Sequence, residues 1–431
     1  MRFVYVLLGL LLMPGIMDAQ VQINSLTSLM QYADEHAPAA RQAKLQPLIA
    51  KQDVHIQASG LYPRVNVFGT GDYYPIIATQ VVPGEIVGKP GTYIKAQFGL
   101  PYVFSAGAEL SIPVINLEKW AQLSRVKAQY DQAEWSGKTA LENFHIQLVQ
   151  AYYQSLVTKE VLKLNDENLA TADELLQVMD ARNKQGVLNP SDYNRTKNLD
   201  LDVQTTGINY KKNLQQSNNN LAALLDAGKD SVVLTEAIDG FSWPLLQDGS
   251  DATARPGWQE ADTKVLVAER LLSETRKSAL PKLALNSRYT YNMQSKFETA
   301  NGNIEFNSAN IGLRLDFPLF QGNYYRSMQH KSNLQLKQAQ LDQERTHATL
   351  TQQQKDWHVQ YNAALSKRAV LNEKVKTTSD NLRIARLNVK EGLMEFDEFN
   401  NIFAEYNRAK IEYLQNLADG ILYYLLSTQK F

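Results

Sequence analysis

The sequence predicts a mixed, mainly α fold. A tube of long α-helical coiled coils is joined to a transmembrane β-barrel that several subunits share, with four strands per chain and twelve in a trimer. Three observations lead to this prediction: an internal repeat, four strand patterns of similar length, and two very long stretches without proline. Helices that long have no globular core to pack on, so they are expected to pack on one another.

The internal repeat is the strongest of these signals. The matched positions, first copy before second, are Pro38 and Pro256, Pro63 and Pro281, Gly107 and Gly312, Leu110 and Leu315, Pro113 and Pro318, and Gly186 and Gly392. The copies are 218 residues apart at the prolines of the first two pairs and 205 to 206 apart afterwards. This shift predicts one longer loop in the first copy, between Pro63 and Gly107. Two structural units of about 200 residues each follow from such a repeat.

The repeat also predicts the domain organisation. The expected parts are a signal peptide (1–19), a first repeat (20–225), an inter-repeat equatorial segment (226–257) and a second repeat (258–431). The first repeat is expected to contain a helix, a β-hairpin (64–113) and a long helical hairpin (117–225). The second is expected to contain a helix, a β-hairpin (282–318) and a long helical hairpin (322–428). The equatorial segment contains Gly, Pro and the β-prone run Val232–Leu234, and is expected to lie outside the tube.

The first residues are typical of an export signal. Arg2 precedes an apolar run from Val4 to Met13, and Ala19 followed by Gln20 forms a plausible cleavage site. The run is too short to span a bilayer as a helix. The net charge of -1 gives no reason to expect a nucleic-acid partner. With no cysteine, the chain has no disulfide, no thiolate metal ligand and no cysteine nucleophile.

Residues 105–113 and 310–317 alternate between apolar and polar side chains, which is the strand signal. Each has a partner upstream, at 64–74 and 282–292. Strands of this length cross a bilayer when tilted, and a barrel wall has one lipid-facing and one polar face. A half-buried sheet in a soluble domain shows the same alternation. Four strands cannot close a barrel, so a membrane-spanning sheet requires several chains.

The loop inside each β-hairpin differs between the repeats. Residues 75–102 contain four prolines and several glycines, and are expected to be irregular and exposed. The matching loop, 294–308, is shorter and polar.

Two helices of about 100 Å are predicted, at 117–183 and about 323–390, because apolar residues recur there at steps of three and four. The segments Gly186–Asp192 and Gly392–Asp397 interrupt them, with a glycine that ends one helix and a polar residue that starts the next. Shorter return helices follow at 191–225 and 397–428. The helices before the strands, 39–59 and 259–278, are expected to extend these end to end.

No catalytic constellation is recognisable. Glu142 with His145, and Glu344 with His347, form two Glu-x-x-His pairs. Two such pairs and two more glutamates build di-metal sites in four-helix bundles, but surface pairs one turn apart look the same. We expect no metal site, no cofactor and no enzyme activity.

The spacing of Pro38, Gly107-x5-Pro113 and Gly186 to Asp192, together with the second copies, resembles that of the TolC-type outer-membrane efflux proteins. The resemblance covers residues 22–429 and implies a homotrimer in the cell outer membrane, with a twelve-stranded barrel and a tube that extends into the periplasm. It also implies two protein partners, a periplasmic adaptor (membrane fusion) protein and an inner-membrane pump of the RND or ABC type.

In that family the tube closes at its tip through acidic rings on the last helical hairpin. The resemblance places the gate at Gly392, Asp397 and Glu398, with Gly186 and Asp192 as the first-copy positions. Position 401, where a second acidic ring is expected, is Asn. For Asp397 and Asp192, a role as a helix N-cap is the alternative. Glu398 has the alternative of a first-turn carboxylate favoured by the helix dipole.

The leading functional hypothesis is a passive exit duct of a tripartite efflux or type I secretion system, with its barrel lumen lined by Glu109, Arg314 and Asp316. The alternative is a soluble periplasmic coiled-coil adaptor or scaffold, which accounts for the helices but not for the four strands.

Overall fold

The computed structural model describes residues 21–227, 232–238, 241–246, 251–296 and 302–429; the predicted signal peptide lies outside these ranges. The chain divides into two compact units. The helical unit comprises the residues up to Gln46, Glu134–Glu260 and Glu344–Phe431, and the sheet unit comprises Pro47–Ala133 and Ala261–Gln343. Both units take residues from both repeats, so the repeat boundaries remain a prediction from the sequence.

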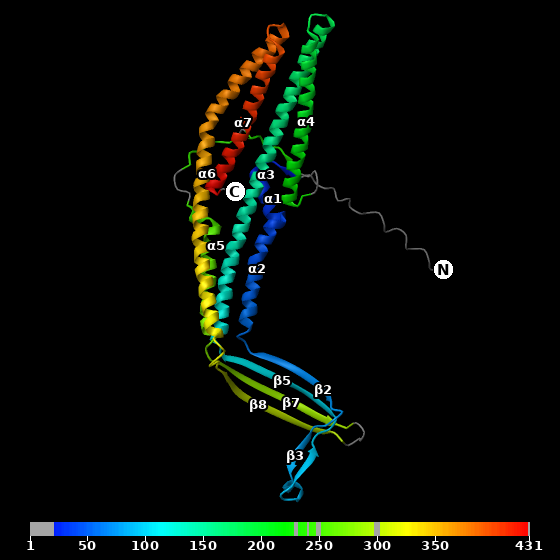
Figure 1. Ribbon diagram of the computed structural model, residues 1–431, viewed down its shortest axis with the longest axis vertical. Coiled ribbons are helices and arrows are strands. Elements are labelled where there is room, and N and C mark those ends of the chain that lie inside the picture. Colours follow the sequence, from blue (N-terminus) through cyan, green and yellow to red (C-terminus); the bar gives the residue numbers. More distant parts are fainter. Residues whose placement is uncertain (1–20, 228–231, 239–240, 247–250, 297–301, 430–431) are drawn as a thin grey trace, which may run out of the picture. The chain divides into compact units, whose positions relative to one another are not determined.

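The sheet unit contains one four-stranded antiparallel sheet in the order β2-β5-β7-β8 (Figure 1). Its strands are β2 (Arg64–Tyr73), β5 (Tyr102–Ile115), β7 (Lys282–Ser295) and β8 (Ile304–Asp316). The four predicted strands are confirmed. The central pair, β5 with β7, joins the hairpin of the first repeat to that of the second.

The register gives the sheet one apolar and one polar face, because side chains opposite each other in a ladder point the same way. On the apolar face Val65 lies opposite Leu110, and Leu285 lies opposite both Ile112 and Leu313. Val65 and Leu313 are exposed large apolar side chains on this face. On the polar face Ser111 Oγ donates to Asn286 Oδ1 across the ladder at 2.9 Å.

The prediction of an irregular loop at 75–102 is wrong for half of that segment. Strands β3 (Thr79–Pro83) and β4 (Tyr93–Gln97) pair antiparallel, and a short 3-10 helix, η1 (Gly84–Val87), connects them. The turn depends on glycine, since a Cβ on Gly84 would lie 2.2 Å from Thr92 Oγ1 and Gly88 has a φ of 76°. Proline content predicted a breaker, whereas the glycines close a hairpin.

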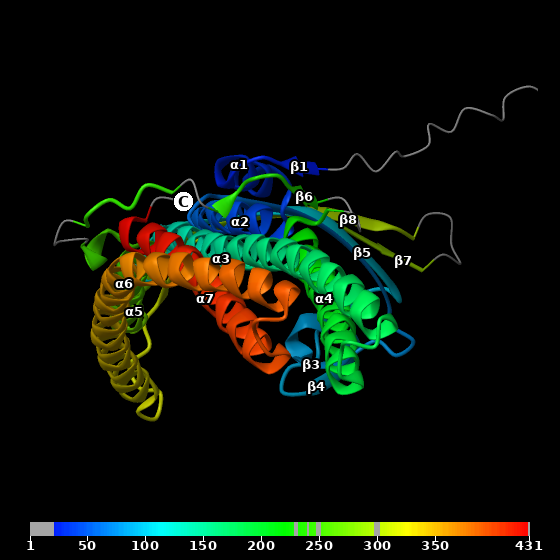
Figure 2. The ribbon, with the colours of Figure 1, turned by 90° about the horizontal axis from the view of Figure 1, so that it is seen from above.

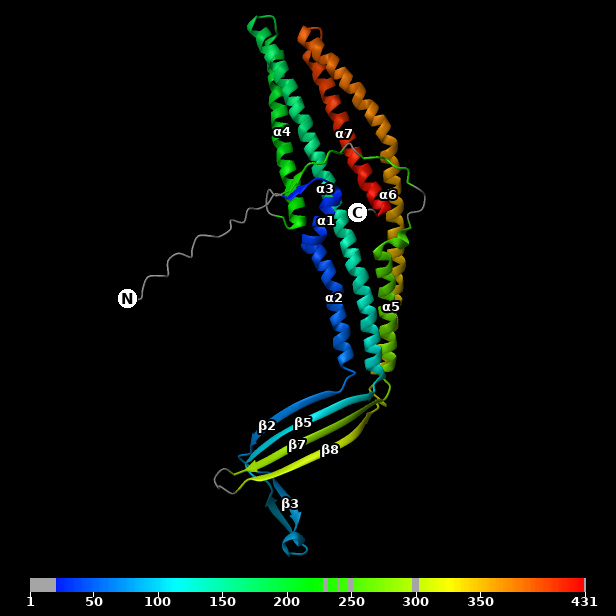
Figure 3. The same ribbon diagram turned by 180° about the vertical axis from the view of Figure 1, so that it is seen from behind.

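Six of the described helices match the predicted lengths closely, and α1 was not predicted. The helices are α1 (Leu26–His36), α2 (Pro38–Ser59), α3 (Leu117–Lys184), α4 (Pro190–Leu225), α5 (Pro256–Lys277), α6 (Tyr324–Glu391) and α7 (Phe396–Thr428). Both long helices, α3 and α6, have 68 residues, which is about 100 Å. In Figure 3 α3 with α4, and α6 with α7, form antiparallel hairpins. Among the described helices none has an apolar stretch long enough to cross a bilayer.

The helical unit has two apolar clusters. The larger one surrounds the middle of α3, where Tyr152 and Leu148 are fully buried against α1, α4 and α7. The smaller one, nearer the hairpin ends, contains Leu175, Val389 and Phe399. In the equatorial segment β6 (Val232–Leu234) pairs parallel with β1 (Val21–Ile23), beside α1 in Figure 2.

We predict that Gly107→Ala destabilises the sheet by about 1–3 kcal/mol, the usual cost of overpacking. A Cβ at Gly107 would lie 2.1 Å from the Tyr289 carbonyl oxygen and 2.9 Å from the Phe68 ring. The matched control is Gly312→Ala, because a Cβ at Gly312 has no atom within 4 Å. Urea unfolding of the two variants measures the difference, and equal midpoints would contradict the expected crowding at Gly107.

Candidate functional site

The two hairpin tips of the helical unit have the same local design. Gly186 and Gly392 end α3 and α6 with φ of 73° and 78°, a left-handed conformation that glycine adopts readily. The next residues, Val187 and Leu393, are 72% and 77% exposed. The residues after them, Leu188 and Met394, pack against the smaller apolar cluster. Each tip therefore presents one apolar side chain outward and anchors the next.

The caps of the return helices differ from the expected ones. The Asn189 side chain caps α4 by accepting from Ser191 N at 3.0 Å, which places Asp192 in the first turn. Helix α7 starts at Phe396, so Glu395 occupies the cap position and Asp397 lies in the first turn with Glu398. Neither Asp192 nor Asp397 is an N-cap, because each helix begins earlier than the aspartate.

Asp397 instead forms an ion pair with Arg195 of α4. Asp397 and Glu398 are exposed, while Phe396 before them and Phe399 after them are buried in the smaller cluster. The structure thus brings Asp397 to the first hairpin and leaves Glu398 on the surface of α7.

Several residues that sequence analysis did not single out hold the two hairpins together near their tips. Glu174 of α3 pairs with both Arg386 and Lys390 of α6. Arg182 of α3 donates to the carbonyl oxygens of Val389, at 3.4 Å, and of Lys390. These carbonyls lie in the last turn of α6, where the helix has no internal donors for them. The sequence does show that Arg182 is a basic residue near the end of α3, which is a signal for binding to helix carbonyls. It does not show that the carbonyls that Arg182 binds belong to another helix, α6.

We predict that Glu174→Ala lowers the unfolding free energy by about 1 kcal/mol, because the network is half-exposed. The control is Asp380→Ala, which removes the Arg383–Asp380 pair within α6 alone. Urea unfolding in low salt and in 1 M salt is the measurement. The effect of Glu174→Ala should exceed that of the control and shrink with salt, since screening weakens ion pairs. Equal effects would show that the cross-helix network contributes nothing specific.

A pair of carboxyl groups lies between α3 and α4. Asp200 of α4 is 5% exposed, and its Oδ2 accepts from Gln204 Nε2 at 2.8 Å. Its Oδ1 is a buried atom for which the described residues provide no donor. Burial, and next the neighbouring carboxyl of Asp173 on α3, raise the pKa of Asp200. The fold therefore favours a protonated carboxyl between the two helices.

The raised pKa predicts how stability depends on pH. The stabilising contribution is complete below the unfolded pKa of about 3.9 and is lost as pH rises through the folded pKa. Asp200→Asn keeps the shape and removes the charge, so it should flatten the fall in stability between pH 4 and pH 7 and add about 1 kcal/mol at neutral pH.

Urea unfolding at several pH values tests this, with the exposed Asp202→Asn on the same helix as control. An unchanged pH slope in Asp200→Asn would contradict it.

The proposed lumen residues share the polar face of the sheet. Glu109 lies opposite Arg288 in the register and forms an ion pair with it. Arg314 Nε is 3.0 Å from Asp316 Oδ2, and both are exposed. Arg288 was missed, although it falls on the polar side of the alternation in 282–292; its guanidinium lies 4.9 Å from the centre of the Phe68 ring.

The Glu-x-x-His pairs are engaged in other contacts. Glu142 Oε1 accepts from buried Arg255 at 2.9 Å, and His145 Nε2 lies 2.8 Å from Asp34 Oδ1. The His347 ring stacks on Trp258 with centroids 3.6 Å apart. Within the described chain no three His, Asp or Glu side chains are arranged to hold a metal ion.

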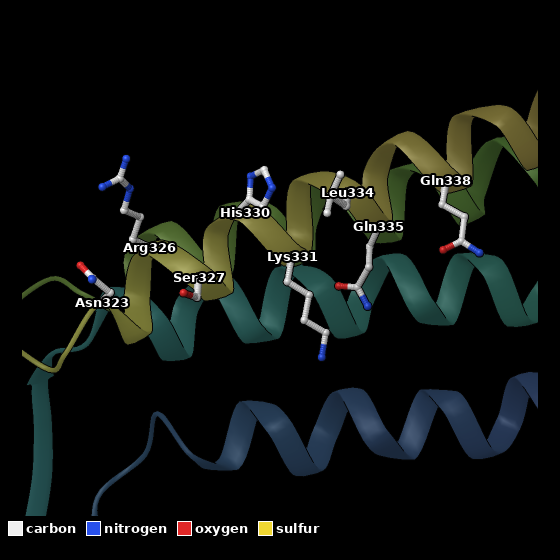
Figure 4. Close-up of a pocket in the computed structure, with 8 residues that line it drawn as sticks. All are labelled: Asn323, Arg326, Ser327, His330, Lys331, Leu334, Gln335 and Gln338. Carbon is white, nitrogen blue, oxygen red and sulfur yellow. The ribbon is translucent and has the colours of Figure 1, made fainter.

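An open groove of about 670 Å³ runs beside the start of α6 (Figure 4). Its lining residues run from Asn323, which directly precedes α6, to Gln338, and all the others belong to that one helix. A groove with a single wall does not enclose a ligand, so it is an exposed helix face rather than a binding pocket.

The fold is similar to that of two membrane proteins of known structure. A membrane protein from Pseudomonas aeruginosa superposes with a TM-score of 0.76 at 17% identity, covering 94% of this chain and 92% of that one. The outer membrane protein VceC of Vibrio cholerae superposes with a TM-score of 0.74 at 14% identity, covering 94% and 95%.

Sequence comparison points to the same class. Residues 29–227 match the family model described as outer membrane efflux protein. The probable efflux pump outer membrane protein TtgC of Pseudomonas putida is 23% identical over 246 residues, which are 54% of this chain and 47% of TtgC. The chain thus spans about half the length of the curated relatives it matches. The resemblance to TolC-type outer-membrane efflux proteins is confirmed.

Proposed function

We propose that this protein is the outer-membrane exit duct of a tripartite efflux or type I secretion system. It passes substrates passively from an inner-membrane pump across the periplasm and the outer membrane. The observation that carries the proposal is the sheet, which has an exposed apolar face and an opposite face bearing Glu109, Arg288 and Arg314. Lipid on one side and a water-filled lumen on the other would satisfy both faces.

A homotrimer would supply the additional strands that one chain needs to close a barrel. Among the described strands, β2 and β8 each pair on one side only and form the edges of the sheet, and four strands are too few to close a barrel. Three copies would pair β8 of one chain with β2 of the next and give twelve strands. Exposed apolar residues of α2, such as Leu48, Ile49 and Ile56, and the open face of α6 are surfaces that a neighbouring copy would cover.

The tips of the tube are proposed to carry the gate and the contact with a periplasmic adaptor. Val187 and Leu393 supply exposed apolar contacts on matching turns, and Gly186 and Gly392 permit those turns. Asp397 and Glu398, with Asp192 on the first hairpin, place carboxylates at the start of each return helix. An inner-membrane pump of the RND or ABC type would provide the energy, so the duct itself needs no enzyme activity.

The alternative, a soluble periplasmic adaptor or scaffold, leaves the exposed apolar face of the sheet unexplained. Fractionation separates the two functions. The duct requires recovery of a detergent-extracted trimer from the outer membrane, as measured by light scattering with the detergent subtracted. A water-soluble monomer or dimer in the periplasm would support the adaptor instead.

Replacing Glu398 tests the gate. We expect Glu398→Ala to raise the resting conductance of the duct in planar bilayers, because a carboxylate that narrows the lumen is removed. Glu405→Ala, at an exposed position two turns further along α7, is the matched control and should leave conductance unchanged. If both variants conduct like the wild type, the constriction is formed elsewhere.

A further inference from the structure

The equatorial segment is bound at one end to the first long helix. Lys159 Nζ of α3 donates to the carbonyl oxygen of Leu234 at 2.8 Å. The hydroxyl of Tyr152, which is fully buried on α3, donates to the carboxylate of Glu236. Burial and this hydrogen bond raise the pKa of Tyr152, so the phenol stays protonated and keeps donating. Residues 232–236 are therefore held on α3 by two side chains about two turns apart.

The other end is bound to the second hairpin. Tyr361 of α6 is fully buried, and its hydroxyl donates to the carbonyl oxygen of Pro244 at 2.6 Å. The Trp243 ring lies nearly parallel to the Tyr361 ring, with centroids 6.1 Å apart and an angle of 18°. The Arg368 guanidinium lies 5.1 Å from the centre of the Trp243 ring. Phe241 adds an edge-to-face contact with Tyr424 of α7 at 5.4 Å.

The Trp243 ring also lies against Gly420 of α7. A Cβ at Gly420 would lie 2.0 Å from the six-membered ring of Trp243, so the indole occupies the space that any other residue would fill. Gly420 is inside α7, where glycine costs about 1 kcal/mol relative to alanine. The backbone there is ordinary helix, so its conformation does not call for glycine. The packing of Trp243 is therefore the remaining reason for a glycine at position 420. The space beside Gly420 that the Trp243 ring fills is called the notch, and the contact of Trp243 with Gly420 is called the latch.

The notch is absent from the first repeat. With Gly392 aligned on Gly186, Gly420 corresponds to Leu214 of α4. The two hairpins are alike at their tips but differ here, so the latch acts on the second hairpin alone.

We propose that residues 232–238 and 241–246 form a strap between α3 and the α6–α7 hairpin. Trp243, seated in the notch at Gly420, is the positioning residue that holds the base of α7 against α6. Gly420 lies 22 residues beyond Glu398 on the same helix, which is about 33 Å. Movement of α7 is then confined to the N-terminal part of this helix, between Phe396 and the latch. The last step of the proposal is that an intact latch keeps the resting duct closed. This step rests on the proposed function as an outer-membrane duct.

Amide hydrogen exchange of the full chain in detergent tests the latch without assuming the duct. In Trp243→Ala and Gly420→Ala, exchange in the C-terminal half of α7 should rise on the order of tenfold, while exchange in α4 stays at the wild-type rate. The double variant should exchange no faster than Trp243→Ala alone, because the added methyl group has no ring to displace. Trp243→Phe, which retains a ring in the notch, should recover most of the protection.

Two controls separate the latch from general damage. Leu245→Ala changes an 84% exposed residue of the strap, and Gly257→Ala changes a helical glycine whose Cβ would meet Leu350 at an ordinary 3.5 Å. Both should behave like the wild type. Equal acceleration in α4 and α7, or additive effects in the double variant, would overturn the latch.

Resting conductance then tests the link to gating. It should rise in Trp243→Ala and Gly420→Ala while the trimer remains intact. Faster exchange in α7 without a rise in conductance would overturn the claim that the latch keeps the duct closed. A wild-type protein that is absent from the outer membrane and does not conduct would refute the duct, and the exchange data would still decide the latch.

Discussion

The antiparallel pairing of β5 with β7 is the contact on which the sheet depends. It is the only ladder, among the described strands, that joins the two repeats, and β2 and β8 are added to its two sides. Because side chains alternate with a period of two, a slip by one residue would exchange the apolar and polar faces across the whole ladder. Leu110, Leu285 and Leu313 share one face, and Glu109 shares the other with Arg288, only in this register.

A second constraint acts on the helices. A helix of 68 residues exposes far more surface than one chain covers, so its burial is local and interrupted. The two apolar clusters lie where several helices of the helical unit meet, around Tyr152 and around Phe399. Between these clusters buried polar groups such as Asn165 and Asp200 line the contact of α3 with α4. Such contacts contribute less stability than apolar packing and leave the hairpins dependent on ties between helices.

Those ties differ in strength along the helical unit. At the tips they are partly exposed ion pairs, such as Glu174 with Lys390 and Asp397 with Arg195, which water and salt weaken. At the base of α7 they are ring packing and buried hydrogen bonds, including Asn416 Nδ2 to the Ala364 carbonyl oxygen at 3.0 Å. A firmly held base with weakly held tips suits a structure that moves at one end.

Periodicity by itself determined the element types, their order and the repeat, because helix and strand periods are local properties of the chain. It also placed Glu109, Arg314 and Asp316 on one polar face. Tertiary structure decided the rest, because partners distant in sequence leave no local pattern. Arg195 and Asp397 meet although they are 202 residues apart. Gly107 and Gly312 are equivalent in the repeat, yet only Gly107 is crowded by Phe68 and Tyr289. Likewise, no pattern in the sequence near Gly420 predicts that the Trp243 ring fills the space beside this glycine, because only the packing of the fold brings the two residues together.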